Sequence, residues 1–166
     1  KGDFSSIAVH NGVALIPVVG SLVNRGAWVG AQSGLVSYEG LAAPLREAAS
    51  DPDVSAIMLD IDSGGGEATG MHALARQIAK INQSKPVYAF VNDVAASAAY
   101  GIASAAREII VSPSSILGSI GVLLIHMDHS GELAKAGIKP TLIHAGANKV
   151  DGNPFEPLPE SVRGDM

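Results

Sequence analysis

The fold of this chain is decided by residues 92–101, which read Asn-Asp-Val-Ala-Ala-Ser-Ala-Ala-Tyr-Gly. An apolar run ending at Phe90 precedes this stretch, and an Ala-rich segment that continues to Arg107 follows it. This order predicts a strand, a turn with a single serine, and a helix. Such a turn presents Ser97 among small side chains, and the first N–H groups of the helix are free to bind an oxyanion. The alternative is that Ser97 only caps the helix.

The composition restricts the class of protein. With 166 residues, 47% of them hydrophobic and only 4% aromatic, the chain can bury one aliphatic, Ala-rich core. Its net charge is −5 and it has no basic run, which argues against nucleic acid or an anionic membrane as the main partner. The lack of cysteine excludes disulfides, thiolate metal sites and a cysteine nucleophile, and it fits a cytoplasmic protein. No apolar run reaches the length of a transmembrane helix.

A second informative stretch lies upstream, where residues 62–67 read Asp-Ser-Gly-Gly-Gly-Glu. They follow an expected strand at 54–61 and precede an expected helix over about 68–82. Three glycines at such a turn let the backbone approach a ligand and direct N–H groups toward it. Neither phosphate-loop pattern is present. An oxyanion hole or a groove for an extended peptide therefore fits better, with a plain glycine turn as the alternative.

The other elements are expected to alternate between strands and helices. Strands at 7–9 and 13–19 flank Asn11-Gly12, a strong hairpin signal, and a Gly-rich loop with Trp28 follows at 20–37. Pro44 predicts a kink or a late start in a helix over 38–50. The further expected strands are 87–91, 108–111, an extended stretch over 116–126, and 140–144; the further expected helices are 98–106, 130–136 and one starting at about 160. This alternation predicts parallel pairing with right-handed crossovers.

Four motifs in this order resemble those of peptidase family S49, the signal-peptide-peptidase-A-like serine proteases within the ClpP/crotonase fold. Their residues are 62–66, which resemble the family's N-S-P-G-G turn, 95–100, which resemble A-A-S-G-G-Y, 117–122, which resemble T-G-S-I-G-V, and 145–149, which resemble S-G-x-x-K. The resemblance covers residues 13 to about 157. Lys149 follows Ser97 by 52 positions, as expected for this family's base and nucleophile.

The resemblance implies an α/β fold of ClpP/crotonase type, with repeated β-β-α units and a mostly parallel sheet flanked by helices. It implies a single S49 peptidase domain over 1–166, which we expect to be part of a longer chain whose last helix is incomplete here. Within the family the chain is most similar to the phage head-maturation proteases. The segments that carry this similarity are 16–23, the loop with Trp28, 37–39 and 151–158.

The resemblance also implies a Ser/Lys dyad. Ser97 would be the nucleophile and Lys149 the base, with Ser119 as a supporting group that orients the lysine. A free lysine has a pKa of about 10.4, which burial must lower by about two to three units for a base near neutral pH. No histidine fits a known triad pattern, and without the resemblance Lys149 would be taken for an exposed loop lysine. No metal or cofactor is implied.

The glycine stretch is implied to complete the site. The backbone N–H groups of Gly66 and Ala98 are the candidate oxyanion donors, with Gly65 in the same turn, and Gly64 and Ser63 are expected to contact the substrate. Two departures concern this region: Gly64 stands where the family has proline, and Ala98 and Ala99 stand where it often has glycines. Neither departure removes a catalytic group.

The implied partners are a peptide or protein substrate and further copies of the chain. Family members form rings, so we expect a homo-oligomer with its active site at or near a subunit interface, and Lys149 acts either within its own chain or from a neighbour. The expected location is the host cytoplasm or a virion precursor.

Several functions remain open. The resemblance favours a serine endopeptidase that cuts scaffold or head proteins during capsid assembly. The alternatives are a signal-peptide-peptidase-like protease that degrades membrane-derived peptides, a non-cleaving assembly or scaffold component, and a crotonase-like acyl-CoA enzyme that uses carboxylates such as Glu67.

Overall fold

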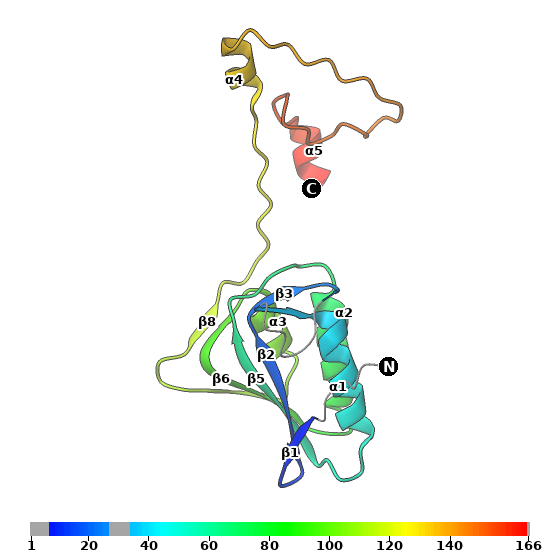
Figure 1. The fold of residues 1–166 in the computed structure, drawn as a ribbon, viewed down its shortest axis with the longest axis vertical. Helices are drawn as coiled ribbons and strands as arrows, with labels where there is room; N and C mark the ends of the chain where they lie inside the picture. The colour runs from blue at the N-terminus through cyan, green and yellow to red at the C-terminus, as the bar shows by residue number, and fades with distance from the viewer. Residues whose placement is uncertain (1–6, 27–33, 166) are drawn as a thin grey trace. The chain divides into compact units, whose positions relative to one another are not determined.

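The computed structural model describes residues 7–26 and 34–165. The chain forms two compact units, residues 1–122 and 123–166, and each is described by itself (Figure 1). The expectation of one S49 domain over 1–166 stays a prediction.

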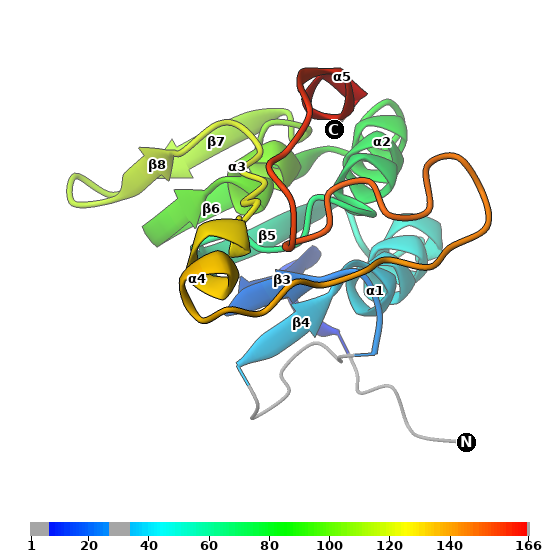
Figure 2. The same cartoon turned by 90° about the horizontal axis from the view of Figure 1, so that it is seen from above.

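The first unit is built on a six-stranded, mostly parallel sheet, as the sequence predicts. Only the first pairing, β1 with β2, is antiparallel. Figure 2 shows β5, β6 and β7 side by side. The strand order is β1 (Ala8–His10), β2 (Val13–Val19), β5 (Ala56–Ser63), β6 (Val87–Ala96) and β7 (Glu108–Val111), with β8 (Ile116–Gly118) paired to the far end of β6.

The predicted hairpin is confirmed at the start of the sheet. Asn11 and Gly12 have φ angles of 50° and 77°, the left-handed conformations that a two-residue turn requires. Further along the sheet, every second residue of β5 is buried while those between stay partly accessible, and the first half of β6 alternates in the same way. The sheet therefore buries one face more completely than the other.

Three helices of this unit pack against the sheet and one another: α1 (Tyr38–Ser50) contacts α2 (Met71–Ile81), and α2 contacts α3 (Ala98–Ala103). α1 buries Leu41, Leu45 and Ala48, the apolar positions of its helical period. The late start predicted from Pro44 is wrong, because the helix begins at Tyr38 and continues through the proline. Ser37 caps it by accepting the Gly40 N–H at 3.0 Å.

Several other expectations need correction. The loop expected over 20–37 contains a parallel ribbon of β3 (Ser21–Val23) and β4 (Leu35–Ser37), while Trp28 lies outside the described residues. α2 starts three residues later than expected and α3 ends three residues earlier. The extended stretch expected from residue 116 onward pairs as a strand only over β8, and the strand expected at 140–144 does not form. Within the described chain the apolar runs at 123–126 and 140–144 find no pairing strand, and Leu123, Ile125 and Ile143 are exposed.

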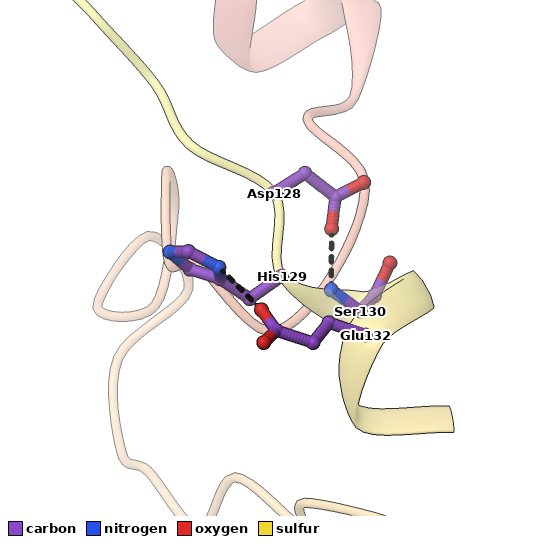
Figure 3. Close-up of polar contacts among 4 residues, drawn as sticks. All are labelled: Asp128, His129, Ser130 and Glu132. Atoms are coloured by element: carbon purple, nitrogen blue, oxygen red, sulfur yellow. Dashed lines mark hydrogen bonds and ion pairs between the residues drawn. The ribbon is translucent and has the colours of Figure 1, made fainter. Parts of the chain in front are cut away.

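The second unit contains two short helices, α4 (Ser130–Lys135) and α5 (Glu160–Asp165). Figure 3 shows the start of α4, where Asp128 Oδ1 accepts the Ser130 N–H at 2.8 Å and His129 lies 3.4 Å from the Glu132 carboxylate. The hydrogen bonds from Ser130 hold the pKa of Asp128 below its usual value. Gly137, with a φ of 72°, follows the helix and ends it in the left-handed conformation that glycine favours. No described helix has the length and apolar content that a membrane crossing requires.

Candidate active site

Ser97 occupies a sharp turn between β6 and α3. Its backbone has φ 52° and ψ −121°, a left-handed conformation that serine adopts only where its surroundings impose it. Buried Ala95, Ala98 and Ala99 surround the turn and fix it to the core. Ser97 stands at the N-cap position of α3, yet its side chain makes no capping hydrogen bond. The reading of Ser97 as a simple helix cap is therefore wrong, and its hydroxyl is not used by the helix.

Ser119 is brought to the neighbouring strand end. β8 pairs in parallel with the end of β6, with Ala96 opposite Gly118, and the Ser97 N–H donates to the Gly118 carbonyl at 2.8 Å. Ser119 follows Gly118 as Ser97 follows Ala96, and it too has a positive φ, 50°. Adjacent strands lie about 4.8 Å apart. The backbones of the two predicted serines are thus neighbours, although 22 positions separate them in the sequence.

The glycine turn, residues 64–67, packs directly on the serine turn. Gly65 has a φ of 99°, and a Cβ added there would lie 2.7 Å from the Ala96 carbonyl oxygen and 2.8 Å from Ser97 Cβ. The same Cβ would lie 3.1 Å from Ala98 N. Only glycine fits this contact. The structure therefore brings Gly65 next to Ser97 and Ala98, while their roles in an oxyanion hole stay a prediction.

Gly66 is held in an extended bridge to β3. The Leu22 N–H donates to the Gly65 carbonyl and the Glu67 N–H donates to the Leu22 carbonyl, each at 2.9 Å. In this pattern the Gly66 N–H faces away from β3. Among the residues that the structure describes, none accepts a hydrogen bond from the N–H of Gly66 or Ala98. The sequence suggested that this turn opens a helix directly, and this is wrong. Gly66 offers its N–H from an extended segment, and α2 begins only at Met71, after its N-cap residue Gly70.

Ser63 and Gly64 have different surroundings. Ser63 is buried, and its hydroxyl donates to the Gly20 carbonyl at 2.6 Å and accepts the Gly65 N–H at 3.1 Å. Its side chain thus supports the glycine turn, and contact with a substrate would have to come from its backbone. A Cβ on Gly64 would meet no atom within 4 Å, so this position faces open space.

Lys149 lies in the second unit, in a turn without regular secondary structure. Its side chain is exposed and its N–H approaches the Gly146 carbonyl at 3.5 Å. His144 contacts the same carbonyl through Nδ1 at 3.1 Å. Lys149 belongs to the second unit and Ser97 to the first, and the pairing of the two stays a prediction.

Two residues that support the glycine turn were missed by sequence reasoning. The Tyr38 hydroxyl donates to the Glu67 carbonyl at 2.5 Å, and the Asn24 N–H donates to Glu67 Oε2 at 2.7 Å. Burial and the nearby Glu67 carboxylate raise the pKa of Tyr38 to about 12. The Tyr38 contact joins residues 29 apart in the sequence, so no local pattern announces it.

Within the described ranges, no group of three or more His, Asp and Glu side chains is placed to hold a metal ion. The groups that the first unit brings together are the Ser97 hydroxyl and the backbone N–H groups of Gly66 and Ala98.

Comparison with known proteins gives consistent results. The model of the family described as Peptidase family S49 matches residues 79–166. The head-tail preconnector protein GP5 of Enterobacteria phage P21 is 48% identical over 95% of this chain and 32% of its own length. The capsid assembly protease C of Escherichia phage lambda is 44% identical over 95% of this chain and 36% of its own length. The chain thus spans about a third of the length of these relatives.

Solved structures show the same fold. An enoyl-CoA hydratase from Mycobacterium avium subsp. paratuberculosis K-10 matches with a TM-score of 0.53 at 23% identity, over 68% of this chain and 45% of its own. The 1510-N membrane-bound stomatin-specific protease matches with a TM-score of 0.53 at 21% identity, over 70% of this chain and 51% of its own. The fold is thus the mixed α/β, mostly parallel fold of the crotonase type, and with the family match over more than half of its length, the chain belongs to peptidase family S49.

Proposed function

We propose that this chain is the catalytic part of a serine endopeptidase that acts on head or scaffold proteins during phage capsid assembly. The observation that carries the proposal is the serine turn: Ser97 is held at a positive φ, its hydroxyl caps nothing, and Gly65 packs against it. The similarity to a capsid assembly protease supports the choice of biological setting. The host cytoplasm, where virion precursors assemble, is the proposed location.

The proposed reaction is acyl transfer. Ser97 Oγ attacks the peptide carbonyl while Lys149 accepts its proton, and the oxyanion that forms accepts hydrogen bonds from the N–H groups of Gly66 and Ala98. Lys149 returns the proton to the leaving amine, and water then hydrolyses the acyl-enzyme. Ser119, which follows the end of the adjacent strand β8, orients the lysine.

The proposal includes a homo-oligomer. A lysine acts as a base only where it is neutral, which requires shielding from water, and Lys149 is exposed in the single chain. Large apolar side chains within residues 120–127 are exposed as well, which favours their burial against other copies. These residues are Ile120, Val122, Leu123, Leu124, Ile125 and Met127, each at least 64% exposed.

The proposal is tested by labelling the protein with a fluorophosphonate and measuring its intact mass. We expect one adduct in the wild type, and none in Ser97→Ala or Lys149→Ala. Ser104→Ala and Lys139→Ala are matched controls, because Ser104 ends α3 with its hydroxyl bonded to the Gly101 carbonyl and Lys139 is an exposed lysine of the second unit. Both controls should label as the wild type does.

Two results would count against the proposal. An adduct that persists in Ser97→Ala would place the nucleophile elsewhere. A wild-type oligomer that takes up no label would favour the non-cleaving assembly component instead.

A further inference from the structure

The residue after the candidate oxyanion donor is held at three separate atoms. The Glu67 N–H donates to the Leu22 carbonyl at 2.9 Å, its carbonyl accepts the Tyr38 hydroxyl at 2.5 Å, and its carboxylate accepts the Asn24 N–H at 2.7 Å. Two of these contacts come from β3 and the segment that follows it. The third contact comes from Tyr38, the first residue of α1. Among the described residues it is the one hydrogen bond between α1 and the glycine turn.

The Tyr38 hydroxyl is itself fixed in place. Only 4% of the residue is accessible, and its ring packs beside Gly70, where an added Cβ would lie 2.9 Å from Tyr38 Cδ2. The backbone of Tyr38 starts a helix whose first turn is capped by Ser37. A buried ring on a capped helix is a rigid support, so the hydroxyl defines where the Glu67 carbonyl can lie.

The support from Tyr38 acts on the segment that carries the Gly66 N–H, and the direction of this N–H matters for binding an oxyanion. The bridge to Leu22 fixes one side of the glycine turn, and the Gly66 N–H faces the other side. The Gly65 carbonyl and the Gly66 N–H belong to one planar peptide, so the bond from the Leu22 N–H sets the direction of that N–H. Glycines adopt many backbone conformations, so this bridge is free to shift unless the chain is also held beyond it. The next residue, Glu67, closes the bridge with its N–H, and its carbonyl is anchored by Tyr38.

We propose that Tyr38 is a positioning residue of the oxyanion site: its hydroxyl anchors Glu67 and thereby holds in place the bridge to Leu22 that directs the Gly66 N–H. The proposal rests on the proposed function. It assigns a role in the reaction to a residue that touches neither the substrate nor Ser97. Burial and the Glu67 carboxylate keep the phenol protonated, and so able to donate, throughout the neutral and mildly alkaline range.

The test measures fluorophosphonate inactivation of the intact protein at several reagent concentrations, which separates the maximal rate constant from the reagent affinity. Tyr38→Phe removes the hydroxyl and keeps the ring. We expect the maximal rate constant to fall about 10- to 100-fold, because an oxyanion donor misplaced by a fraction of an ångström stabilises the transition state less. Reagent affinity should stay unchanged. Tyr88→Phe, near the opposite end of β6 from Ser97, is the matched control and should react like the wild type.

A role limited to stability gives a different result. In that case Tyr38→Phe would lower the midpoint of thermal unfolding while the folded protein reacted at the wild-type rate, and the proposal would be overturned. The proposal would also be overturned if Tyr38→Phe and the wild type had equal inactivation rates and equal midpoints of thermal unfolding. A wild-type protein that takes up no label would overturn the serine peptidase function itself, and this inference with it, so the two failures are told apart.

Discussion

At the scale of residues, the site depends on a few backbone conformations that most side chains avoid. Ser97 and Ser119 have positive φ angles at the ends of adjacent strands, and Gly65 has a positive φ where it meets Ser97. A non-glycine residue held in this region costs of order 1–3 kcal/mol, which the surrounding structure must offset. The packing of Ala98 and Ala99 into the core offers that compensation for Ser97.

The two neighbouring glycines allow a matched comparison. We expect Gly65→Ala to slow fluorophosphonate labelling about 100-fold or more, because its Cβ would collide with Ala96 and Ser97 and its φ of 99° disfavours alanine. Gly64→Ala should label at nearly the wild-type rate, since its Cβ points into open space. Labelling rates and unfolding midpoints of both variants check this. Equal behaviour of the two would show that the glycine turn is not held against the nucleophile.

Tyr38 gives the protein a specific pH dependence. Its pKa is about 12 in the folded chain against 10.0 for a free tyrosine. Between these values the unfolded chain loses the proton first and therefore binds fewer protons, so stability should fall as pH rises from about 10 to about 12. Chemical unfolding across this range measures the loss. Tyr38→Phe should reduce that dependence, and an unchanged slope would contradict the assignment.

Sequence reasoning reached Ser97 and the glycine turn because their signals are local: small residues around one serine, and three glycines after a strand. It did not reach Tyr38 or Asn24, whose roles depend on contacts made only after folding. It also assigned Ser63 to the substrate, whereas the hydroxyl of this residue is buried in bonds to Gly20 and Gly65.

At the scale of elements, α1 is closed at its C-terminal end by a residue from outside the helix. Lys85 Nζ donates to the carbonyls of Ala48 and Asp51 at 2.8 Å and 2.6 Å. These carbonyls have no partner inside a helix, and a cation there also favours the helix dipole. The contact ties the end of α1 to the segment that leads into β6.

Replacing Lys85 should therefore destabilise the first unit. We expect Lys85→Met to lower the free energy of unfolding by about 1–3 kcal/mol, the usual range for hydrogen bonds to a charged group. Lys139→Met, at an exposed position of the second unit, should change it little. Denaturant unfolding measures both. A Lys85→Met protein as stable as the wild type would show that water satisfies these carbonyls equally well.

The elements that the sequence predicted correctly are those with their own stop and start signals. Asn11-Gly12 defined the hairpin, and the apolar period of Leu41, Leu45 and Ala48 defined α1. The strand expected at 140–144 does not form, because an apolar run specifies a strand only together with a neighbouring strand that pairs with it. The late start of α1 expected from Pro44 is wrong, because packing of the buried face maintains the helix across one missing hydrogen bond.

At the scale of the whole molecule, the proposed site needs groups from both units. Ser97, Ser119 and the glycine turn belong to the first unit and Lys149 to the second. The 52 positions between Ser97 and Lys149 give their order in the chain but not which copy supplies the lysine, which is why the sequence left this open.

Mixed oligomers distinguish the two arrangements. If the lysine comes from a neighbouring copy, co-expressed Ser97→Ala and Lys149→Ala chains should restore labelling, with the adduct on the Lys149→Ala chain, which keeps its serine. Differently tagged chains and intact-mass measurement identify the labelled one. We expect this restoration. A mixture that stays unlabelled, beside a wild-type oligomer that labels, would place both groups in one chain.

The division of β6 between two partner strands has a consequence for local motion. β7 pairs with residues 88–91 of β6, β8 pairs with residues 94–96, and neither pairs with Asn92 or Asp93. On that side the nucleophile-bearing end of β6 is secured by only three residue pairs, so it can open without unfolding of the sheet centre. Amide hydrogens of residues 94–97 should therefore exchange with deuterium sooner than those of residues 88–91.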